Sequence, residues 1–380
     1  MIAAASDGAL EALLGRLDAR FAAAGSAAVA ARHLFPAETL LDLYGEDLRT
    51  RAFLFPGGGT GEELCLRPDF TVPVALAHGA GGWDRQAAYR YRGPVFRRQA
   101  GGSARPVEYL QAGIESLGRP DGAAAEAEVF ATLLAALADA CPAPVTVATG
   151  DLGIAFALLD ALPLAPRRRR ALKRHFWRPA RFHALIAEFA APPRAPSPRR
   201  AALLEAAGVP DPEAAVAALA EEAGEVLGLR ETAEIAARAS ELAVAAGEPP
   251  MDPAHGRLIE AALAVSGPAP QALAELDRLL AGTGPAVAAA LERFADRLAA
   301  LEMAGIATAE LPFDAAFGRK LEYYDGFVFE VAAAGRPELP PLAGGGRYDS
   351  MTVRLGAAPP VPAVGGMIRP EAALAAGERG

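Results

Sequence analysis

The stretch GRKLEYYDGFVFEV, residues 318–331, sets an arginine and two adjacent tyrosines directly before an alternating apolar run. Alternation of this kind predicts a β-strand with one buried face. On a strand, Tyr323 and Tyr324 would point to opposite faces, so only one of them could line a pocket while the other packs in the core. The stretch therefore predicts a sheet and raises the question of which ligand, if any, its arginine and tyrosine hold.

Length and composition indicate a globular protein. The 380 residues, of which 52% are hydrophobic and 22% charged, are enough for two or three domains and argue against broad disorder. Neither a signal peptide nor an apolar run long enough to span a membrane is found in the sequence. The two cysteines, Cys65 and Cys141, lie in apolar segments, which predicts packed thiols rather than a disulfide or a metal site. We therefore expect a cytoplasmic protein.

The charge balance is acidic, because 37 basic residues face 46 acidic ones for a net charge of −9. Such a chain is poorly suited to neutralising phosphates, so nucleic-acid binding is not expected. The exception is the basic block RRRRALKRH at residues 167–175. We interpret this block as the solvated face of a helix, with contact to RNA or to an acidic partner surface as the alternative.

Strand and turn signals dominate both ends of the chain. Residues 87–99 and 107–118 predict a long antiparallel hairpin with a mobile, basic tip. The glycine-rich residues 56–62 predict a tight turn between two shorter strands. A helix is expected from Thr71, whose hydroxyl could cap it, and another at residues 123–140.

The middle of the chain differs from its ends. Between residues 165 and 300, alanine, leucine, glutamate and arginine dominate and strand-like alternation disappears, which predicts a helical insertion. The fold class is therefore α+β, an antiparallel sheet flanked by helices. We expect residues 1–164 and 301–380 to form the two parts of one core, with residues 165–300 inserted between them.

Polar side chains recur at alternate positions of the predicted strands. Gln111 and Glu115 share a strand face with Gly113, which leaves open space above the sheet for a small polar molecule. Buried glutamine and glutamate need partners, so an ordinary core face would not favour this pattern. Arg97, on the neighbouring strand, is explained either by a structural ion pair or by a ligand. Asp69 lies just past a strand end, where its carboxylate either receives an ammonium group or caps the following helix.

Five segments occur in a characteristic order: LRPDFT, YRGPVFRRQ with YLQAGIESLG, GRKLEYYDGFVFE, GGGRYD and PAVGGMI. In order and relative position they resemble the catalytic core of histidyl-tRNA synthetase, a class II aminoacyl-tRNA synthetase. The resemblance covers nearly the whole chain outside the insertion and implies a class II synthetase fold. It also implies a histidine pocket formed by Asp69, Thr71, Arg97, Gln111, Glu115, Arg319, Tyr323 and Tyr324.

The resemblance implies a role for most of these side chains. Asp69, Thr71 and Gln111 would receive the ammonium group of histidine, and Arg319 would meet its carboxylate. Glu115 and Tyr324 would bracket the imidazole nitrogens, which suits their hydrogen-bonding capacity. The GGGRYD segment would close the pocket wall with backbone too close for larger side chains.

Two departures from the synthetases concern ATP. Gln99 replaces the glutamate that reads adenine, although Arg97 is kept, and Ala372 stands where the family has an arginine over the triphosphate. Alanine cannot neutralise a phosphate, and we do not expect Arg369, three residues earlier, to substitute for it. The sequence also ends about one helix later, so no anticodon-binding domain is expected.

A histidine pocket without an ATP clamp is similar to the synthetase-like regulatory subunits of ATP phosphoribosyltransferase. This resemblance implies a non-catalytic, histidine-sensing chain without cofactor or metal, which forms a homodimer through its N-terminal segment. The homodimer would join a short-form catalytic subunit in a hetero-oligomer of histidine biosynthesis and bring feedback inhibition by histidine. A truncated active synthetase or histidine-adenylating enzyme, and a tRNA-binding sensor module, remain the alternatives.

Overall fold

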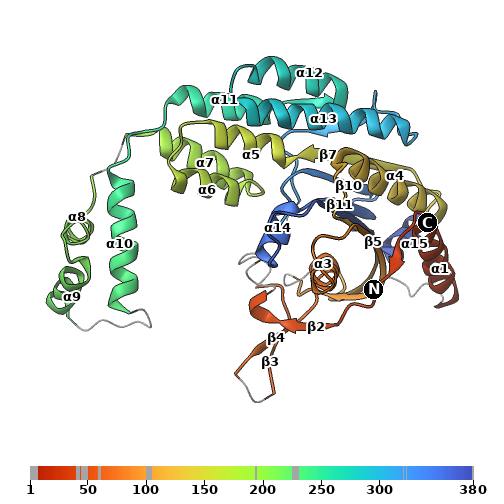
Figure 1. Ribbon diagram of the computed structural model, residues 1–380, viewed down its shortest axis with the longest axis horizontal. Helices are drawn as coiled ribbons and strands as arrows, with labels where there is room; N and C mark the ends of the chain where they lie inside the picture. Colours follow the sequence, from red (N-terminus) through yellow and green to blue (C-terminus); the bar gives the residue numbers. More distant parts are fainter. Residues whose placement is uncertain are drawn as a thin grey trace. The chain divides into compact units, whose positions relative to one another are not determined.

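The computed structural model describes residues 7–39, 43, 50–58, 61–99, 105–192, 195–224, 231–319, 321 and 323–378. The chain forms two compact units, one made of Met1–Ala161 with Ala261–Gly380 and the other of Leu162–Glu260. The first unit combines a sheet with helices and the second is helical (Figure 1). The expected α+β class is confirmed.

A seven-stranded sheet organises the first unit, in the order β1-β5-β6-β12-β11-β10-β7. All neighbouring strands are antiparallel except the edge pair β1 and β5, which is parallel. The long hairpin is confirmed as β5 and β6; residues 100–104 of its tip lie outside the described residues. The strands are β1 (Ala27–Ala28), β5 (Ala87–Phe96), β6 (Glu108–Leu117), β7 (Val145–Asp151), β10 (Phe327–Ala333), β11 (Ala343–Arg347) and β12 (Ala363–Ile368).

Helices cover one face of this sheet. Phe130 of α4 packs edge-on against Phe327 and Phe329 of β10, with ring centroids 5.8 and 4.8 Å apart, and all three rings are buried. Helices α1 and α15 pack beside α4 on the same sheet (Figure 1). The helices of this unit are α1 (Asp7–Ala23), α3 (Thr71–Ala80), α4 (Gly122–Ala140), α5 (Leu152–Ala161), α12 (Ala269–Leu280), α13 (Pro285–Met303), α14 (Asp349–Arg354) and α15 (Pro370–Gly377).

Two small sheets complete the first unit. Strands β2 (Leu34–Pro36), β4 (Glu63–Leu66) and β3 (Leu54–Pro56) form one of them, and the antiparallel pairing of β3 with β4 confirms the predicted turn-linked strands. Two residues of that turn, Gly59 and Thr60, lie outside the described residues. Strands β8 (Ser266–Pro268) and β9 (Pro312–Asp314) form the other small sheet.

The second unit is helical, as the composition of the insertion predicts. Its helices are α6 (Pro166–His175), α7 (Pro179–Ala190), α8 (Pro198–Ala206), α9 (Pro212–Ala223) and α10 (Thr232–Ala246). The boundary of the unit at Glu260 falls within α11 (Pro253–Leu263). Ala206, Val216 and Ala236 form a small apolar core among α8, α9 and α10. No helix of the described residues is both long and apolar enough to cross a membrane.

The unit ends at Glu260, whereas the insertion was expected to continue to residue 300. The difference comes from α13, whose side chains bind the sheet unit. Phe294 stacks on Phe313 with ring centroids 4.6 Å apart, and Arg297 forms ion pairs with Glu126 and Asp151 at 3.0 and 2.8 Å. Helical periodicity shows that α13 has a buried face, but it does not show which unit buries that face.

Candidate functional site

The face of the large sheet opposite α4 carries the candidate site. Strand β6 is regular through Gln111, Gly113 and Glu115, so these three residues share one face as the sequence predicts. In the neighbouring strands, Tyr91 lies opposite Gly113 and Gly365 lies opposite Glu115. Directly opposed residues of antiparallel strands project to the same side. The site floor therefore spans β5, β6 and β12.

Glu115 is the centre of the hydrogen-bond network. Its side chain is 1% exposed, and its carboxylate accepts hydrogen bonds from the hydroxyls of Thr71, Tyr91 and Tyr348 at 2.9, 3.2 and 2.5 Å. Burial raises the pKa of Glu115 to about 8, although the hydroxyl hydrogen bonds oppose this rise. With three hydroxyl donors bound, Glu115 has one position left for a ligand nitrogen: it can accept an N–H when ionised, or donate its own O–H when protonated.

The two tyrosines of the opening stretch both reach the site, which contradicts the prediction that they face opposite sides. Strand β10 begins only at Phe327, and Tyr323 lies in a turn before it. The Tyr323 hydroxyl is 3.5 Å from the hydroxyls of Tyr324 and Thr71 and from the carboxylate of Asp69. A strand's two-residue period does not apply to this turn, so the two rings lie on the same side.

The start of α3 supplies Asp69 and Thr71. Helix α3 has Phe70 at its N-cap without a side-chain cap, so the prediction that Thr71 caps the helix is wrong. The Thr71 hydroxyl instead donates to Glu115. Asp69 forms an ion pair with Arg97 at 3.8 Å, and the Arg97 guanidinium also donates to the Pro68 carbonyl at 2.7 Å.

Glycines bring the backbone of β11 and β12 close to the polar side chains. A Cβ at Gly344 would overlap the Arg319 guanidinium, and a Cβ at Gly365 would overlap the Glu115 carboxyl. Arg319 is buried and donates to the Tyr324 hydroxyl at 3.5 Å. Only glycine leaves room for these side chains above the sheet.

Gln111 is a buried side chain whose hydrogen-bonding groups the surrounding network does not satisfy. It is 1% exposed, and among the described residues neither its amide nitrogen nor its amide oxygen has a hydrogen-bond partner. Leaving buried polar atoms unsatisfied costs about 1–3 kcal/mol, so native proteins rarely do it without a reason. A polar ligand on this face would supply the missing partners.

Seven of the eight predicted residues are linked by hydrogen bonds or ion pairs, and the eighth, Gln111, shares a strand face with Glu115. The structure adds two more residues. Sequence reasoning assigned no role to Tyr91 or Tyr348, which both donate to Glu115. The hairpin register could have indicated Tyr91, because it is opposite Gly113. Tyr348 lies 233 residues from Glu115, and no local pattern predicts that pairing.

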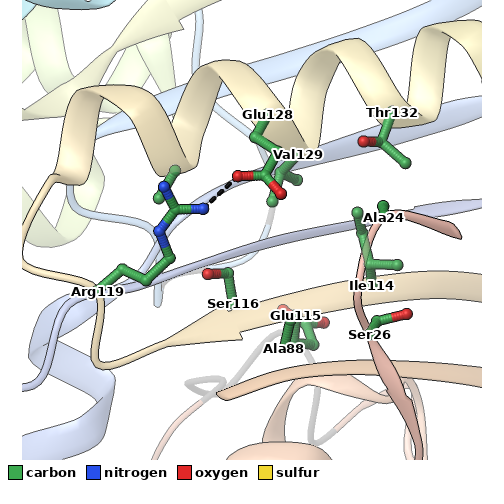
Figure 2. Close-up of a pocket in the computed structure, with 11 residues that line it drawn as sticks. Ala24, Ser26, Ala88, Ile114, Glu115, Ser116, Arg119, Glu128, Val129 and Thr132 are labelled. Carbon is green, nitrogen blue, oxygen red and sulfur yellow. Dashed lines mark hydrogen bonds and ion pairs between the residues drawn. The ribbon is translucent and has the colours of Figure 1, made fainter. Parts of the chain in front are cut away.

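A separate cavity of about 40 Å³ lies on the other side of the sheet, beneath α4 (Figure 2). Ser116 and Ile114 point toward it, and an ion pair between Arg119 and Glu128 borders it. Glu115 also borders this cavity, but strand alternation directs its carboxyl to the opposite face, where the three hydroxyls bind it. The cavity is therefore not the candidate site.

Within the described residues, no group of three or more His, Cys, Asp and Glu side chains could hold a metal ion. Cys65 and Cys141 are buried free thiols, as predicted.

Comparison with known proteins identifies the family. A family model described as histidyl-tRNA synthetase matches residues 5–246 and 236–372. A protein of Mesorhizobium japonicum named ATP phosphoribosyltransferase regulatory subunit is 40% identical over 367 residues, which cover 91% of this chain and 92% of the relative. The chain belongs to the family of ATP phosphoribosyltransferase regulatory subunits. A relative of the same name from Agrobacterium fabrum is 38% identical, with 92% and 93% of the two chains covered.

Solved structures share the fold of this regulatory-subunit family. The crystal structure of an ATP phosphoribosyltransferase regulatory subunit/histidyl-tRNA synthetase from Bacillus halodurans matches with a TM-score of 0.69 and 20% identity, over 98% of this chain and 80% of that chain. Histidyl-tRNA synthetase from Nostoc matches with a TM-score of 0.61 and 15% identity, over 96% and 70%. At these identities the likeness concerns the fold, and it confirms the synthetase-like core.

Two positions at which this regulatory-subunit chain departs from the synthetases now have structural context. Ala372 is buried in α15. The Gln99 amide donates to the Pro106 carbonyl at 3.0 Å, which links the segment after β5 to the segment before β6. Arg369 precedes α15, and its guanidinium donates to the Pro341 carbonyl and lies over the Tyr109 ring. These contacts occupy the side chain, so it does not replace the arginine missing at Ala372.

Proposed function

We propose that this chain is the non-catalytic regulatory subunit of an ATP phosphoribosyltransferase and is required for the first step of histidine biosynthesis. The active site would lie on a short-form catalytic subunit that assembles with it. The observation that carries this proposal is the name shared by relatives that are 36–40% identical over most of the chain. We further propose that histidine binds the candidate site and acts there as the feedback inhibitor.

The chemistry of the site supports histidine as its ligand. Glu115 has one position left for an imidazole nitrogen, as the acceptor of its N–H when ionised or as a donor to it when protonated, and the Tyr324 hydroxyl can pair with the other ring nitrogen. The Arg319 guanidinium suits a carboxylate, while Asp69 and the amide oxygen of Gln111 suit an ammonium group. Binding would satisfy the Gln111 amide and complete the network.

The same face argues against adenylation of histidine. The synthetase-like arginine over the triphosphate is replaced by the buried Ala372, and Gln99 is bound to the backbone of its own hairpin. Adenylation needs cations positioned where charge develops on the phosphates. The chain would therefore bind the amino acid without activating it.

We also propose that the subunit acts as a homodimer within a hetero-oligomer, in which histidine binding is linked to the arrangement of the catalytic chains. A ligand shifts such an equilibrium only by its differential affinity for the two arrangements, typically about 1–3 kcal/mol.

The test is reconstitution with a purified short-form catalytic subunit. Phosphoribosyl transfer to ATP should appear or rise when this chain is added and should fall when histidine is added. A Glu115→Ala variant should still activate the catalytic subunit but lose the response to histidine. Failure of the wild-type chain to bind and activate the catalytic subunit would contradict the proposal, as would histidine-dependent pyrophosphate–ATP exchange by this chain alone.

A further inference from the structure

Helix α6 carries a stripe of exposed arginines in the second unit. Arg167, Arg170 and Arg174 are exposed and follow the spacing i, i+3 and i+7, which places them along one side of the helix. With a rise of about 1.5 Å per residue, the stripe is about 10 Å long. We refer to these three residues as the arginine stripe.

The neighbouring arginines of α6 have structural roles, whereas the stripe does not. Arg168 forms an ion pair with Glu248 at 3.1 Å, and Arg169 donates to the Leu164 carbonyl at 3.1 Å. Within the part of the chain that the structure describes, no ion pair or hydrogen bond involves a stripe guanidinium. The helix is therefore fixed by its inward-facing arginines, and the stripe is left to solvent.

The stripe is unfavourable for the helix that carries it. Like charges three or four residues apart repel each other, and α6 has no acidic residue in its first turn to offset Arg167 and Arg170. Positive charge near a helix N-terminus also opposes the helix dipole. A merely solvated face would favour acidic residues at that end, so the stripe needs another explanation.

Positive charge continues past the end of α6. Residues 166–181 contain eight basic residues and no acidic one, although the whole chain has a net charge of −9. The pKa of His175 is lowered by burial and then by Arg178, Arg174 and Arg181. This local field has the opposite sign to the rest of the chain and would attract carboxylates or phosphates.

We propose that the arginine stripe is the docking surface for a carboxylate-rich surface of the catalytic subunit. Guanidinium groups pair with carboxylates in two-bond geometry, and three of them over about 10 Å can fix the register of a protein surface. The inference rests on the proposed function, which requires a partner chain.

A protein surface fits the stripe better than RNA. A net charge of −9 repels a long polyanion, whereas a compact acidic patch feels mainly the local field. The nearby Trp177 ring is partly buried, and the Arg178 guanidinium covers one of its faces 4.2 Å from the ring centre, which leaves less of the ring for stacking on a base.

The test compares two triple variants of the full chain. R167E/R170E/R174E reverses the stripe, and R199E/R200E/R257E makes the same change of charge at three other exposed arginines of the second unit. Binding to the catalytic subunit should weaken by about tenfold or more for the stripe variant and by less than about threefold for the control. Raising the salt concentration should weaken the wild-type complex more than the stripe variant's complex.

Histidine affinity and the melting temperature report whether the stripe variant is folded. Both should stay close to the wild-type values. The three glutamates repel one another as the arginines did, but glutamate near the start of α6 suits the helix dipole, and no stripe residue belongs to the histidine site. Equal weakening by the two variants, or by neither, would overturn this inference while leaving the proposed function intact. Loss of tRNA binding with unchanged binding of the catalytic subunit would also overturn it. A wild-type chain that does not bind the catalytic subunit would instead overturn the proposed function.

Discussion

In the ligand-free protein the Glu115 carboxyl is mostly protonated at pH 7, because burial raises its pKa to about 8. An unperturbed imidazole has a pKa near 6.5, so the side chain of free histidine is mostly neutral at the same pH. In the proposed complex the two groups would share one proton, either as the acid with neutral imidazole or as the carboxylate with imidazolium. Between the two pKa values, binding therefore neither takes up nor releases a proton at this pair.

This proton count predicts a plateau in the pH dependence of histidine affinity. Affinity should be nearly constant from about pH 6.5 to about pH 8. Below the plateau it should fall by up to tenfold per pH unit, because free histidine carries an extra proton that must leave. Above the plateau it should fall again, because Glu115 has already lost the proton that the complex needs. Calorimetric titrations across this pH range measure the profile.

A Glu115→Gln variant is the control, because its side chain has nearly the same shape and does not titrate. It should bind histidine more weakly and lose the decline that Glu115 causes above pH 8, while keeping the decline below pH 6.5. Without histidine it should also become progressively more stable than the wild type as pH rises from about 4.5 to about 8. The sign follows because the raised pKa of Glu115 makes wild-type stability fall as pH rises. A wild-type affinity that rises through pH 8 would contradict the shared proton.

At the scale of elements, the glycines of β11 and β12 determine whether polar side chains fit above the sheet. Gly365→Ala should lower stability by about 1–3 kcal/mol and abolish measurable histidine binding, because the new Cβ would overlap the Glu115 carboxyl and the Ile114 backbone. Gly15→Ala in α1 is the matched control, since a Cβ there meets nothing within 4 Å and alanine is the better helix former. Thermal unfolding and histidine titration separate the two outcomes. Full histidine affinity in Gly365→Ala would show that Glu115 is not at the binding face.

Much of this element structure could be predicted from sequence, because its signals are local. The alternation that predicts β5 and β6 also places Gln111 and Glu115 on one face. The turn before β10 could not be predicted in this way. The Asp325 carboxylate accepts hydrogen bonds from the backbone of Asp349 and Ser350, so a segment far away in the chain determines where the strand begins.

The site residues likewise fall into those that a local pattern predicts and those that depend on contacts between distant segments. Strand alternation within β6 indicated Gln111 and Glu115, whereas Tyr348 joins them only because β11 and β12 bring it across the sheet. The helical unit ends at Glu260 rather than at the expected residue 300 for a related reason. The amphipathic pattern of α13 predicts that one face is buried, but it does not predict that this face contacts Phe313 and Glu126.

At the scale of the molecule, a network of ion pairs connects the segment that carries Tyr348 with helices α4 and α13 of the same unit. Arg347, next to Tyr348, pairs with Glu126 at 3.1 Å and with Asp349 at 2.7 Å. Glu126 also pairs with Arg297 of α13, which is 2% exposed. Buried ion pairs tolerate little displacement, because an unpaired buried charge is costly. A shift of the Tyr348 segment on ligand binding would therefore be passed to α4 and α13 rather than absorbed locally.

Feedback through this site predicts a reciprocal coupling that can be measured without any assay of activity. If histidine changes the affinity of this chain for the catalytic subunit by some factor, the catalytic subunit must change the affinity for histidine by the same factor, about 5–150-fold in typical allosteric proteins. Calorimetry gives both numbers: histidine titrated into the chain alone and into the complex, and catalytic subunit titrated with and without saturating histidine. The Glu115→Ala variant should show no effect of histidine on assembly. A factor of one in the wild type would contradict a link between histidine binding and assembly. Unequal factors would mean that a second histidine site on the catalytic subunit contributes, because linkage at a single site permits only equality.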